Sequence, residues 1–189
     1  MTPAETIADL RSYLRRFAVD RKAISAVEFA LILPFMVFTY VGSAELGDGM
    51  AIYYKATETA RTVTDLASQY VTIDSITMGN ILGASAQVVA PYSSANMVVT
   101  LSEVSPTNAS GQGTITWSCS LNGTARTVGT TVTLPTNLQT ENNVSIIWGE
   151  VTYPYTPAMG YAVAGTINLY QAIYFYPRLS DSITLTSGC

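Results

Sequence analysis

The sequence predicts an α+β fold in which a long N-terminal helix, first membrane-spanning and then amphipathic, packs on an antiparallel β-sheet. Three observations lead to this prediction. Residues 29–44 carry no charge, apolar residues then recur at spacings of three and four, and from Asn96 short runs rich in Val, Thr, Ser and Tyr alternate with turn residues. These patterns are typical of a membrane helix, an amphipathic helix and strands, in that order.

Residues 24–44 are long enough to cross a bilayer. As a helix, these twenty-one residues would cover about 31 Å, and the hydrocarbon core of a bilayer is about 30 Å thick. The single charge, Glu28, lies about one turn from the start, where it costs less than the roughly 2.5–3.5 kcal/mol of a charge at the centre. A buried helix of a soluble protein is the alternative, but such helices rarely contain so long an uncharged stretch.

The distribution of charge predicts the orientation of this span. Five of the nine Lys and Arg residues precede Ile24, and basic residues beside a span favour the cytoplasmic side. The N-terminus is therefore expected in the cytoplasm and the chain after about residue 45 outside it. Residues 24–189 carry four basic and ten acidic groups, a formal balance of −6. Nucleic acid is therefore not an expected partner, because phosphate binding needs clustered Lys and Arg.

Beyond the span the helix is expected to continue, so that a single helix covers about residues 25–71. Its amphipathic part is indicated by a stripe at helical spacing, Leu46, Met50, Tyr53, Thr57, Ala60, Thr64, Ala67 and Tyr70. The neighbouring Tyr53 and Tyr54 are expected to pack on the sheet. Residues 74–95 are predicted to form a second, weaker helix and a connector.

Strands are predicted over residues 97–104, 114–121, 144–153, 166–176 and 182–186, where β-branched residues and alternation recur. Asn122-Gly123 directly follows the second of these runs and is a strong hairpin signal. Short turns between successive strands favour an antiparallel sheet packed on the long helix.

The two cysteines suit a domain outside the cytoplasm. Cys119 lies in a predicted strand and Cys189 ends the printed sequence. An even pair in an oxidising compartment predicts a disulfide, which would close a loop of about 70 residues and contribute on the order of 4 kcal/mol. Two free thiols are the alternative.

The composition offers little for catalysis. The chain contains no His, which excludes His-based triads and most zinc sites. It also contains no Ser-x-x-Lys, Cys-x-x-Cys or Gly-rich phosphate loop. We therefore expect no enzyme, metal, cofactor or small-molecule substrate. The Tyr-rich and Pro-rich residues 153–161 are either a docking surface or rigid connectors between strands.

The run Ser25-Ala-Val-Glu-Phe-Ala-Leu-Ile-Leu-Pro34 resembles the N-terminal motif of TadE/TadG-like pseudopilins, single-pass proteins of the tight-adherence (Flp) pilus. Two later runs, Glu150-Val-Thr-Tyr-Pro-Tyr-Thr-Pro157 and Phe175-Tyr-Pro-Arg178, are similar to distal strands of that family. The resemblance covers the first 70 residues well and the last 40 moderately, and it is slight over residues 80–148.

This resemblance implies a pilin-like fold and a processing site. A prepilin peptidase would cut between Ala23 and Ile24, although Gly is more usual than Ala at the position before the cut. Glu28 would become the fifth residue of the mature chain and pair with the new α-amino group of a neighbouring Ile24, or else would simply snorkel to the headgroups. Pro34 would kink the helix, either to ease packing or extraction or without any role.

The chain is expected to divide into a cytoplasmic basic leader (1–23), a transmembrane helix (24–45), an amphipathic helix with second helix and connector (46–95) and a periplasmic sheet domain (96–189). The favoured function is a minor pilin in the bacterial inner membrane or in the pilus. Its partners would be the prepilin peptidase, other pilin or pseudopilin subunits, the inner-membrane platform and lipid. An uncleaved anchor presenting a periplasmic domain and a secreted adhesin-like domain are the alternatives.

Overall fold

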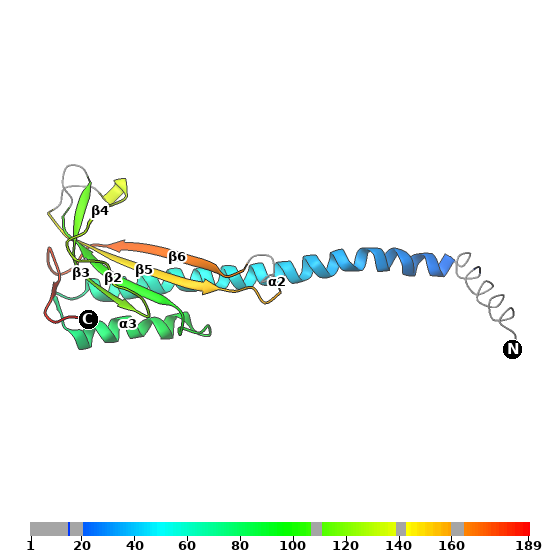
Figure 1. Ribbon diagram of the computed structural model, residues 1–189, viewed down its shortest axis with the longest axis horizontal. Coiled ribbons are helices and arrows are strands. Elements are labelled where there is room, and N and C mark those ends of the chain that lie inside the picture. The colour runs from blue at the N-terminus through cyan, green and yellow to red at the C-terminus, as the bar shows by residue number, and fades with distance from the viewer. Residues whose placement is uncertain (1–14, 16–20, 107–110, 139–142, 160–164) are drawn as a thin grey trace. The chain divides into compact units, whose positions relative to one another are not determined.

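The long helix and the antiparallel sheet predicted from the sequence are both present in the computed structural model of the chain (Figure 1). The structure describes residue 15 and residues 21–106, 111–138, 143–159 and 165–189. The elements are α2 (Arg21–Ser68), β1 (Thr72–Ile73), α3 (Ser75–Val89), β2 (Val98–Val104), β3 (Gln112–Leu121), β4 (Thr131–Thr133), a short 3-10 helix η1 (Thr136–Leu138), β5 (Ile146–Tyr155), β6 (Ile167–Phe175) and β7 (Thr184–Leu185). The chain forms two units, Met1–Leu46 and Gly47–Cys189, and we describe each by itself.

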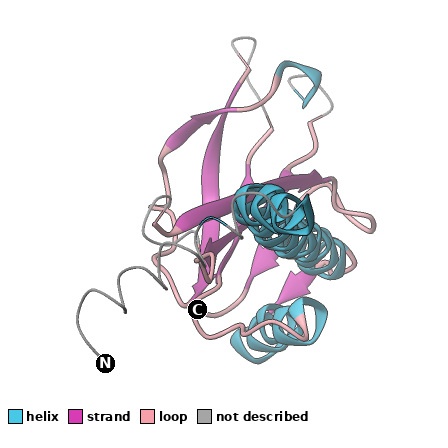
Figure 2. Cartoon of the chain, turned by 90° about the vertical axis from the view of Figure 1, so that its right-hand side faces the viewer, coloured by secondary structure: helices cyan, strands magenta, loops and turns pink. Residues whose placement is uncertain are grey.

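The second unit is built on a five-stranded sheet in the order β4-β3-β2-β5-β6, with antiparallel neighbours throughout. Figure 2 looks along α2 and shows both α2 and α3 against this sheet. Alternate residues of the central strands face the helices and form the main core. These are Val99 and Leu101 of β2, Trp117 and Cys119 of β3, and Ile147 and Val151 of β5. A smaller apolar cluster of Val104, Ile115, Leu134 and Ile146 lies beyond the β-bulge at Glu103 and Val104.

The face that α2 buries differs from the predicted stripe. Small residues dominate the buried set, which consists of Ile52, Ala56, Thr59, Ala60, Val63, Thr64, Ala67 and Ser68. The predicted positions Ala60, Thr64 and Ala67 belong to it, but Leu46, Met50, Tyr53 and Tyr70 are exposed. Tyr54 is also exposed, so the prediction that Tyr53 and Tyr54 pack on the sheet was wrong. Small side chains let the helix approach the sheet closely, and size decided the buried face more than hydrophobicity did.

The contact between Thr64 and Gly149 shows how close this approach is. Gly149 lies in β5, opposite Leu101 of β2, and a Cβ atom added there would collide with Oγ1 of Thr64 and meet the Ala60 carbonyl oxygen at 3.2 Å. The Thr64 hydroxyl donates to that same carbonyl at 2.6 Å, so it turns back onto its own helix. No side chain at position 149 fits without displacing α2.

Two predictions about strand pairing were wrong. The segment 182–186 was expected in the antiparallel sheet, but β7 instead pairs in parallel with the unpredicted β1, with Thr184 beside Thr72. Asn122-Gly123 does turn the chain, and Asn122 has a positive φ of 57°. The returning chain, however, forms a strand only at Thr131–Thr133, where it pairs with the start of β3. The Asn122 amide donates to the Met97 carbonyl at 3.1 Å, so the turn is tied to the segment before β2.

We predict that Gly149→Ala lowers the free energy of unfolding of the full-length chain in detergent by about 1–3 kcal/mol, because the added methyl overpacks the contact with Thr64. Urea unfolding followed by tryptophan fluorescence measures the change. Gly79→Ala is the matched control, since Gly79 is exposed on α3 with open space around it, and it should stabilise by about 0.5–1 kcal/mol. Equal effects of the two substitutions would contradict the close packing of α2 on β5.

Candidate functional site

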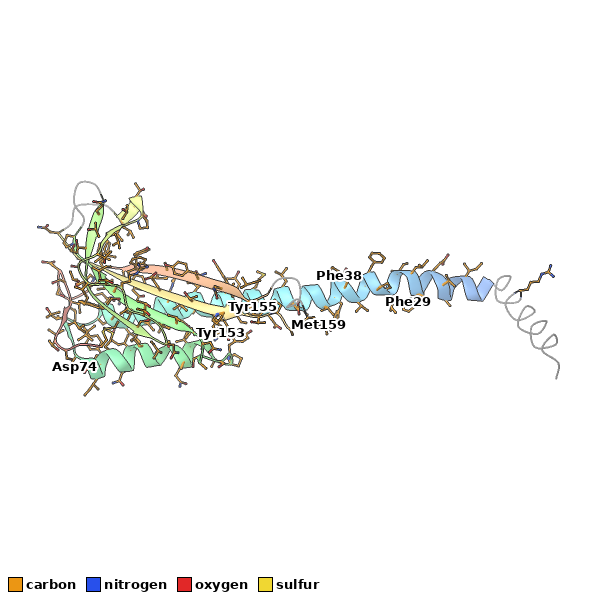
Figure 3. The ribbon with its side chains drawn as sticks, in the orientation of Figure 1. Phe29, Phe38, Asp74, Tyr153, Tyr155 and Met159 are labelled. Atoms are coloured by element: carbon orange, nitrogen blue, oxygen red, sulfur yellow. A yellow bond between two sulfur atoms is a disulfide. The ribbon has the colours of Figure 1, made fainter. Side chains whose placement is uncertain are left out.

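The first candidate site is the apolar segment at residues 24–44, where large apolar side chains are exposed along α2. Phe38 is 81% exposed and Phe35 is 75% exposed, and Figure 3 shows Phe29 and Phe38 projecting from the helix. Among the described residues, α2 is the one helix long and apolar enough to cross a membrane, and none of its apolar window is buried. So large an apolar surface marks a contact with lipid or with another protein.

Two hydroxyl groups within this segment are hydrogen-bonded to the helix itself. Thr39 donates to the Phe35 carbonyl and Ser43 donates to the Tyr40 carbonyl, both at 2.8 Å. Helix α2 also continues through Pro34. Hydroxyl groups bonded to carbonyls of their own helix suit a hydrocarbon environment, where unsatisfied groups are costly.

The predicted processing and assembly residues all lie on α2. Ala23 and Ile24 are helical residues of α2, so a peptidase that needs an extended substrate would first have to unwind the helix there. Glu28 is exposed, and among the side chains that the structure describes none forms an ion pair with it. Its carboxylate is therefore on the surface of the described part of α2.

A second cluster joins Arg126 to Glu150 on the face of the sheet that points away from the helices. The Arg126 Nε and Nη2 atoms donate to the two Glu150 carboxylate oxygens at 2.6 and 2.7 Å. Its guanidinium lies 3.9 Å from the centre of the Trp148 ring, which in turn stacks on Tyr174. The Tyr170 hydroxyl donates to Glu150 at 2.6 Å. This network fastens the segment after β3 onto β5 and β6.

Hydrogen bonding and burial in this cluster favour the protonated forms of Arg126 and Tyr170. The hydrogen bonds to Glu150 raise the pKa of Arg126 above its usual value. Partial burial and the hydrogen bond to Glu150 raise the pKa of Tyr170 well above 10. Because the charges of Arg126 and Glu150 compensate each other, we interpret the cluster as a structural clasp.

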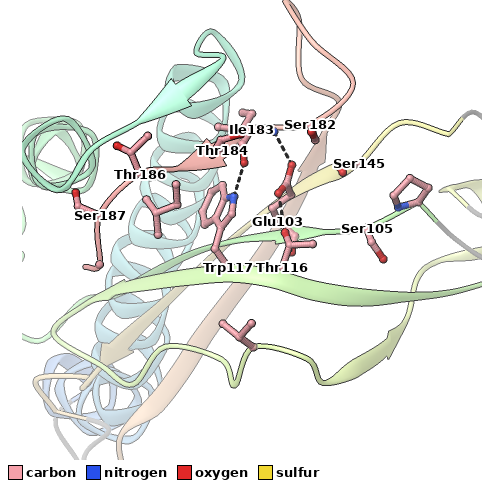
Figure 4. Close-up of a pocket in the computed structure, with 14 residues that line it drawn as sticks. Glu103, Ser105, Thr116, Trp117, Ser145, Ser182, Ile183, Thr184, Thr186 and Ser187 are labelled. Atoms are coloured by element: carbon pink, nitrogen blue, oxygen red, sulfur yellow. Dashed lines mark hydrogen bonds between the residues drawn. The ribbon is translucent and has the colours of Figure 1, made fainter.

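A pocket of about 680 Å³ lies between the end of β2 and the C-terminal segment (Figure 4). Its one carboxylate, Glu103, is 3% exposed. One Glu103 oxygen accepts the Ile183 amide at 2.7 Å and the other accepts the Thr116 hydroxyl at 2.6 Å. Trp117 donates its indole N–H to the Ile183 carbonyl at 2.8 Å. The amide and the carbonyl of Ile183 are thus both hydrogen-bonded, an arrangement that we call the Ile183 clamp. In this clamp the Glu103 carboxylate has a structural role.

Residues 182–189, which we call the C-terminal strap, are also held by the disulfide. Cys119 and Cys189 are joined, as the sequence predicted, with Cα atoms 5.5 Å apart. The attachments of the strap include the disulfide, the clamp at Ile183 and the parallel pairing of β7 with β1. The residues that hold the strap lie in β3, in β2 and in β1, which follows α2. The strap therefore connects distant parts of the domain.

Several of these residues escaped the sequence analysis. A buried carboxylate in β2 that binds a backbone amide leaves no local pattern, and neither does the pairing of Arg126 with Glu150. The one available signal was the scarcity of cations, because Arg126 is one of four after the span. Residues 153–161 only partly form the predicted loop: Tyr153 and Tyr155 lie in β5, and Tyr161 lies outside the described residues.

No protein-family model, curated protein or solved structure matches this chain.

We predict that Cys189→Ser lowers the free energy of unfolding by about 2–4 kcal/mol, because the disulfide closes a loop of 70 residues. Urea unfolding without reductant measures the change. As an internal control, reductant should bring the unchanged chain down to the stability of the variant and leave the variant itself unaffected. An unchanged midpoint in both tests would show that the strap is held without the bond.

We also predict that alkaline pH weakens the clasp. The folded-state pKa of Tyr170 is raised, so its contribution to stability is fully present below pH 10 and is lost as the pH rises through the folded-state value. Between about pH 9 and 11 the free energy of unfolding should therefore fall less steeply for Tyr170→Phe than for the unchanged chain. Tyr176→Phe, at another exposed tyrosine, is the control and should keep the original slope.

Proposed function

We propose that this chain is a minor pilin, or pseudopilin, of a tight-adherence type IV pilus, held in the membrane by the apolar part of α2. The observation that carries the proposal is the run from Ala23 to Pro34. It places a small residue, then an acid five positions later, at the start of an exposed apolar helix. The resemblance to pseudopilins rests on this order of residues. The α+β arrangement of the second unit suits a pilin-like domain.

In this proposal Glu28 directs assembly. Cleavage before Ile24 would create an α-amino group, and a carboxylate in an apolar filament core needs a cation to offset its desolvation. Glu28 is exposed on α2, where a neighbouring subunit can reach it. Its charge would thereby set the axial register between one subunit and the next.

The disulfide supports placement of the second unit outside the cytoplasm. A bond between Cys119 and Cys189 persists in an oxidising compartment such as the periplasm. The excess of basic residues before Ile24 favours the same orientation. We therefore place the N-terminus in the cytoplasm and the sheet domain in the periplasm.

An uncleaved single-pass anchor is the second candidate. It is favoured by the helical conformation of Ala23 and Ile24, which a peptidase would need to unwind. In that case the sheet domain would be displayed permanently at the membrane surface.

The test is the N-terminal sequence and intact mass of the protein isolated from membranes, with and without a co-expressed prepilin peptidase. We expect a peptidase-dependent chain that starts at Ile24. Ala23→Leu should block cleavage, because a larger side chain does not fit a site for small residues, while Ala23→Gly should preserve or improve it. Glu28→Gln should still be cleaved, since it keeps the shape of the site, but should no longer copurify with other pilus subunits.

A chain that starts at residue 1 or 2 in the presence of active peptidase would replace the pseudopilin with the uncleaved anchor. A soluble product that starts at Glu45 would instead indicate secretion after signal-peptide removal. Normal copurification of Glu28→Gln would remove the assembly role of that carboxylate without affecting the anchor.

A further inference from the structure

Strand β6 leaves one edge of the sheet open. It is the outermost strand of the five-stranded sheet and is paired with β5 on its inner side (Figure 1). Among the described residues, no hydrogen bond reaches its main chain from the outer side. Alternate residues of an edge strand direct their N–H and C=O groups away from the neighbouring strand. The outer edge of Ile167–Phe175 therefore presents a row of donors and acceptors that another strand can pair with.

The composition of β6 does nothing to shield this edge. Native edge strands are commonly protected by charged residues, proline, bulges or short length. Strand β6 has nine residues without a charge or a proline, and its pairing with β5 runs without a shift in register. The opposite edge differs, because β4 has only three residues and the chain at Arg126 and Gly129 is hydrogen-bonded to β3. Of the two edges, the one at β6 is suited to receive another strand.

Both ends of β6 lie beside α2. At the start of the strand, Ile167 pairs with Tyr155, whose ring lies 3.2 Å from the position of a Cβ atom on Gly49. Just past the end of the strand, Arg178 forms an ion pair with Asp65. All of these residues belong to the second unit, so the relation between β6 and this part of α2 is fixed within one unit.

A stripe of α2 lies on the same side of the helix as Asp65. Residues at spacings of three and four share one side of a helix, and these positions are Met50, Tyr54, Thr57 and Arg61. Met50 and Tyr54 are 50% and 61% exposed. Arg61 is exposed as well and forms no ion pair with the side chains that the structure describes. We call the outer edge of β6 together with this stripe the β6 edge site.

We propose that the β6 edge site binds an extended segment of another protein, which adds a strand to the sheet. Main-chain hydrogen bonds to β6 supply the affinity, and alternate side chains of the segment contact the stripe. Apolar side chains on that face of the segment match Met50 and Tyr54.

The segment also carries a carboxylate at the level of Arg61, because a strand that covers this guanidinium must offset its desolvation. A second copy of this chain fits less well, since its own β6 contains no charged residue. The inference concerns the second unit alone and rests neither on the membrane anchor nor on the role in a pilus.

The test uses synthetic peptides of nine residues, the length of β6, and the full-length chain in phosphatidylcholine nanodiscs, with binding to empty nanodiscs subtracted. The first peptide alternates valine and threonine and has a central glutamate in line with the valines. The second has lysine in place of that glutamate, and the third has the composition of the first without the alternation. Fluorescence anisotropy gives the dissociation constants, and hydrogen exchange reports on the β6 amides.

We expect the glutamate peptide to bind saturably and to slow the exchange of alternate β6 amides, those that point away from β5. The lysine peptide should bind roughly three- to tenfold more weakly, because it places a like charge beside Arg61. Arg61→Glu should invert the order of the two peptides. Thr131→Glu is the matched control, since Thr131 is exposed on the opposite edge strand β4, and it should leave the order unchanged.

The inference would be overturned by a lack of saturable binding, or by equal binding of the peptide without alternation. Slow exchange of all β6 amides in the free chain would also overturn it, because the edge would then already be covered. An unchanged order of the peptides in Arg61→Glu would reject the carboxylate. A dimer of the chain in detergent, seen by sedimentation and accompanied by slowed exchange of the same alternate amides, would assign the edge to a second copy instead.

Discussion

A change in side-chain size along α2 is the constraint on which the structure depends. Large apolar residues cover the helix through residue 44 and are exposed, whereas small ones line the face buried between Ala56 and Ser68. The first part cannot remain in water at reasonable cost. The second allows a sheet to approach so closely that Gly149 must lack a side chain. One continuous element is therefore both the candidate anchor and the central piece of the domain core.

Polar contacts between loops and the sheet supplement the modest apolar core of the domain. The clasp of Arg126 and Glu150 and the clamp of Glu103 on Ile183 each join segments that are far apart in the sequence. A buried carboxylate that accepts two hydrogen bonds is costly to disturb, because removing one partner leaves it unsatisfied. Such contacts fix the loops in one arrangement on the sheet. Without them, the hydrogen bonds between strands would be the main interactions that hold the sheet.

The features that were predictable are those with a local signature. An uncharged run, helical spacing and β-branched segments identified α2, α3 and the strands β2, β3, β5 and β6 within a few residues. Two cysteines were enough to predict the disulfide. Parallel pairing of β1 with β7 was not predictable, because each strand has two residues and their pairing depends on the disulfide and the Ile183 clamp. The buried face of α2 was predicted only in part, because hydrophobic spacing assigned the exposed Met50 and Tyr53 to it along with small residues.

The position of the C-terminal strap in the sequence also affects the order of folding. Glu103 and Trp117 lie in strands that are synthesised well before Ile183, the residue to which both are hydrogen-bonded. Until that residue arrives, the carboxylate stays hydrated and Cys119 has no partner. Contacts between residues so distant in sequence form slowly, so the sheet would assemble first as an open structure. Arrival of the strap is then a late step in the folding of the second unit.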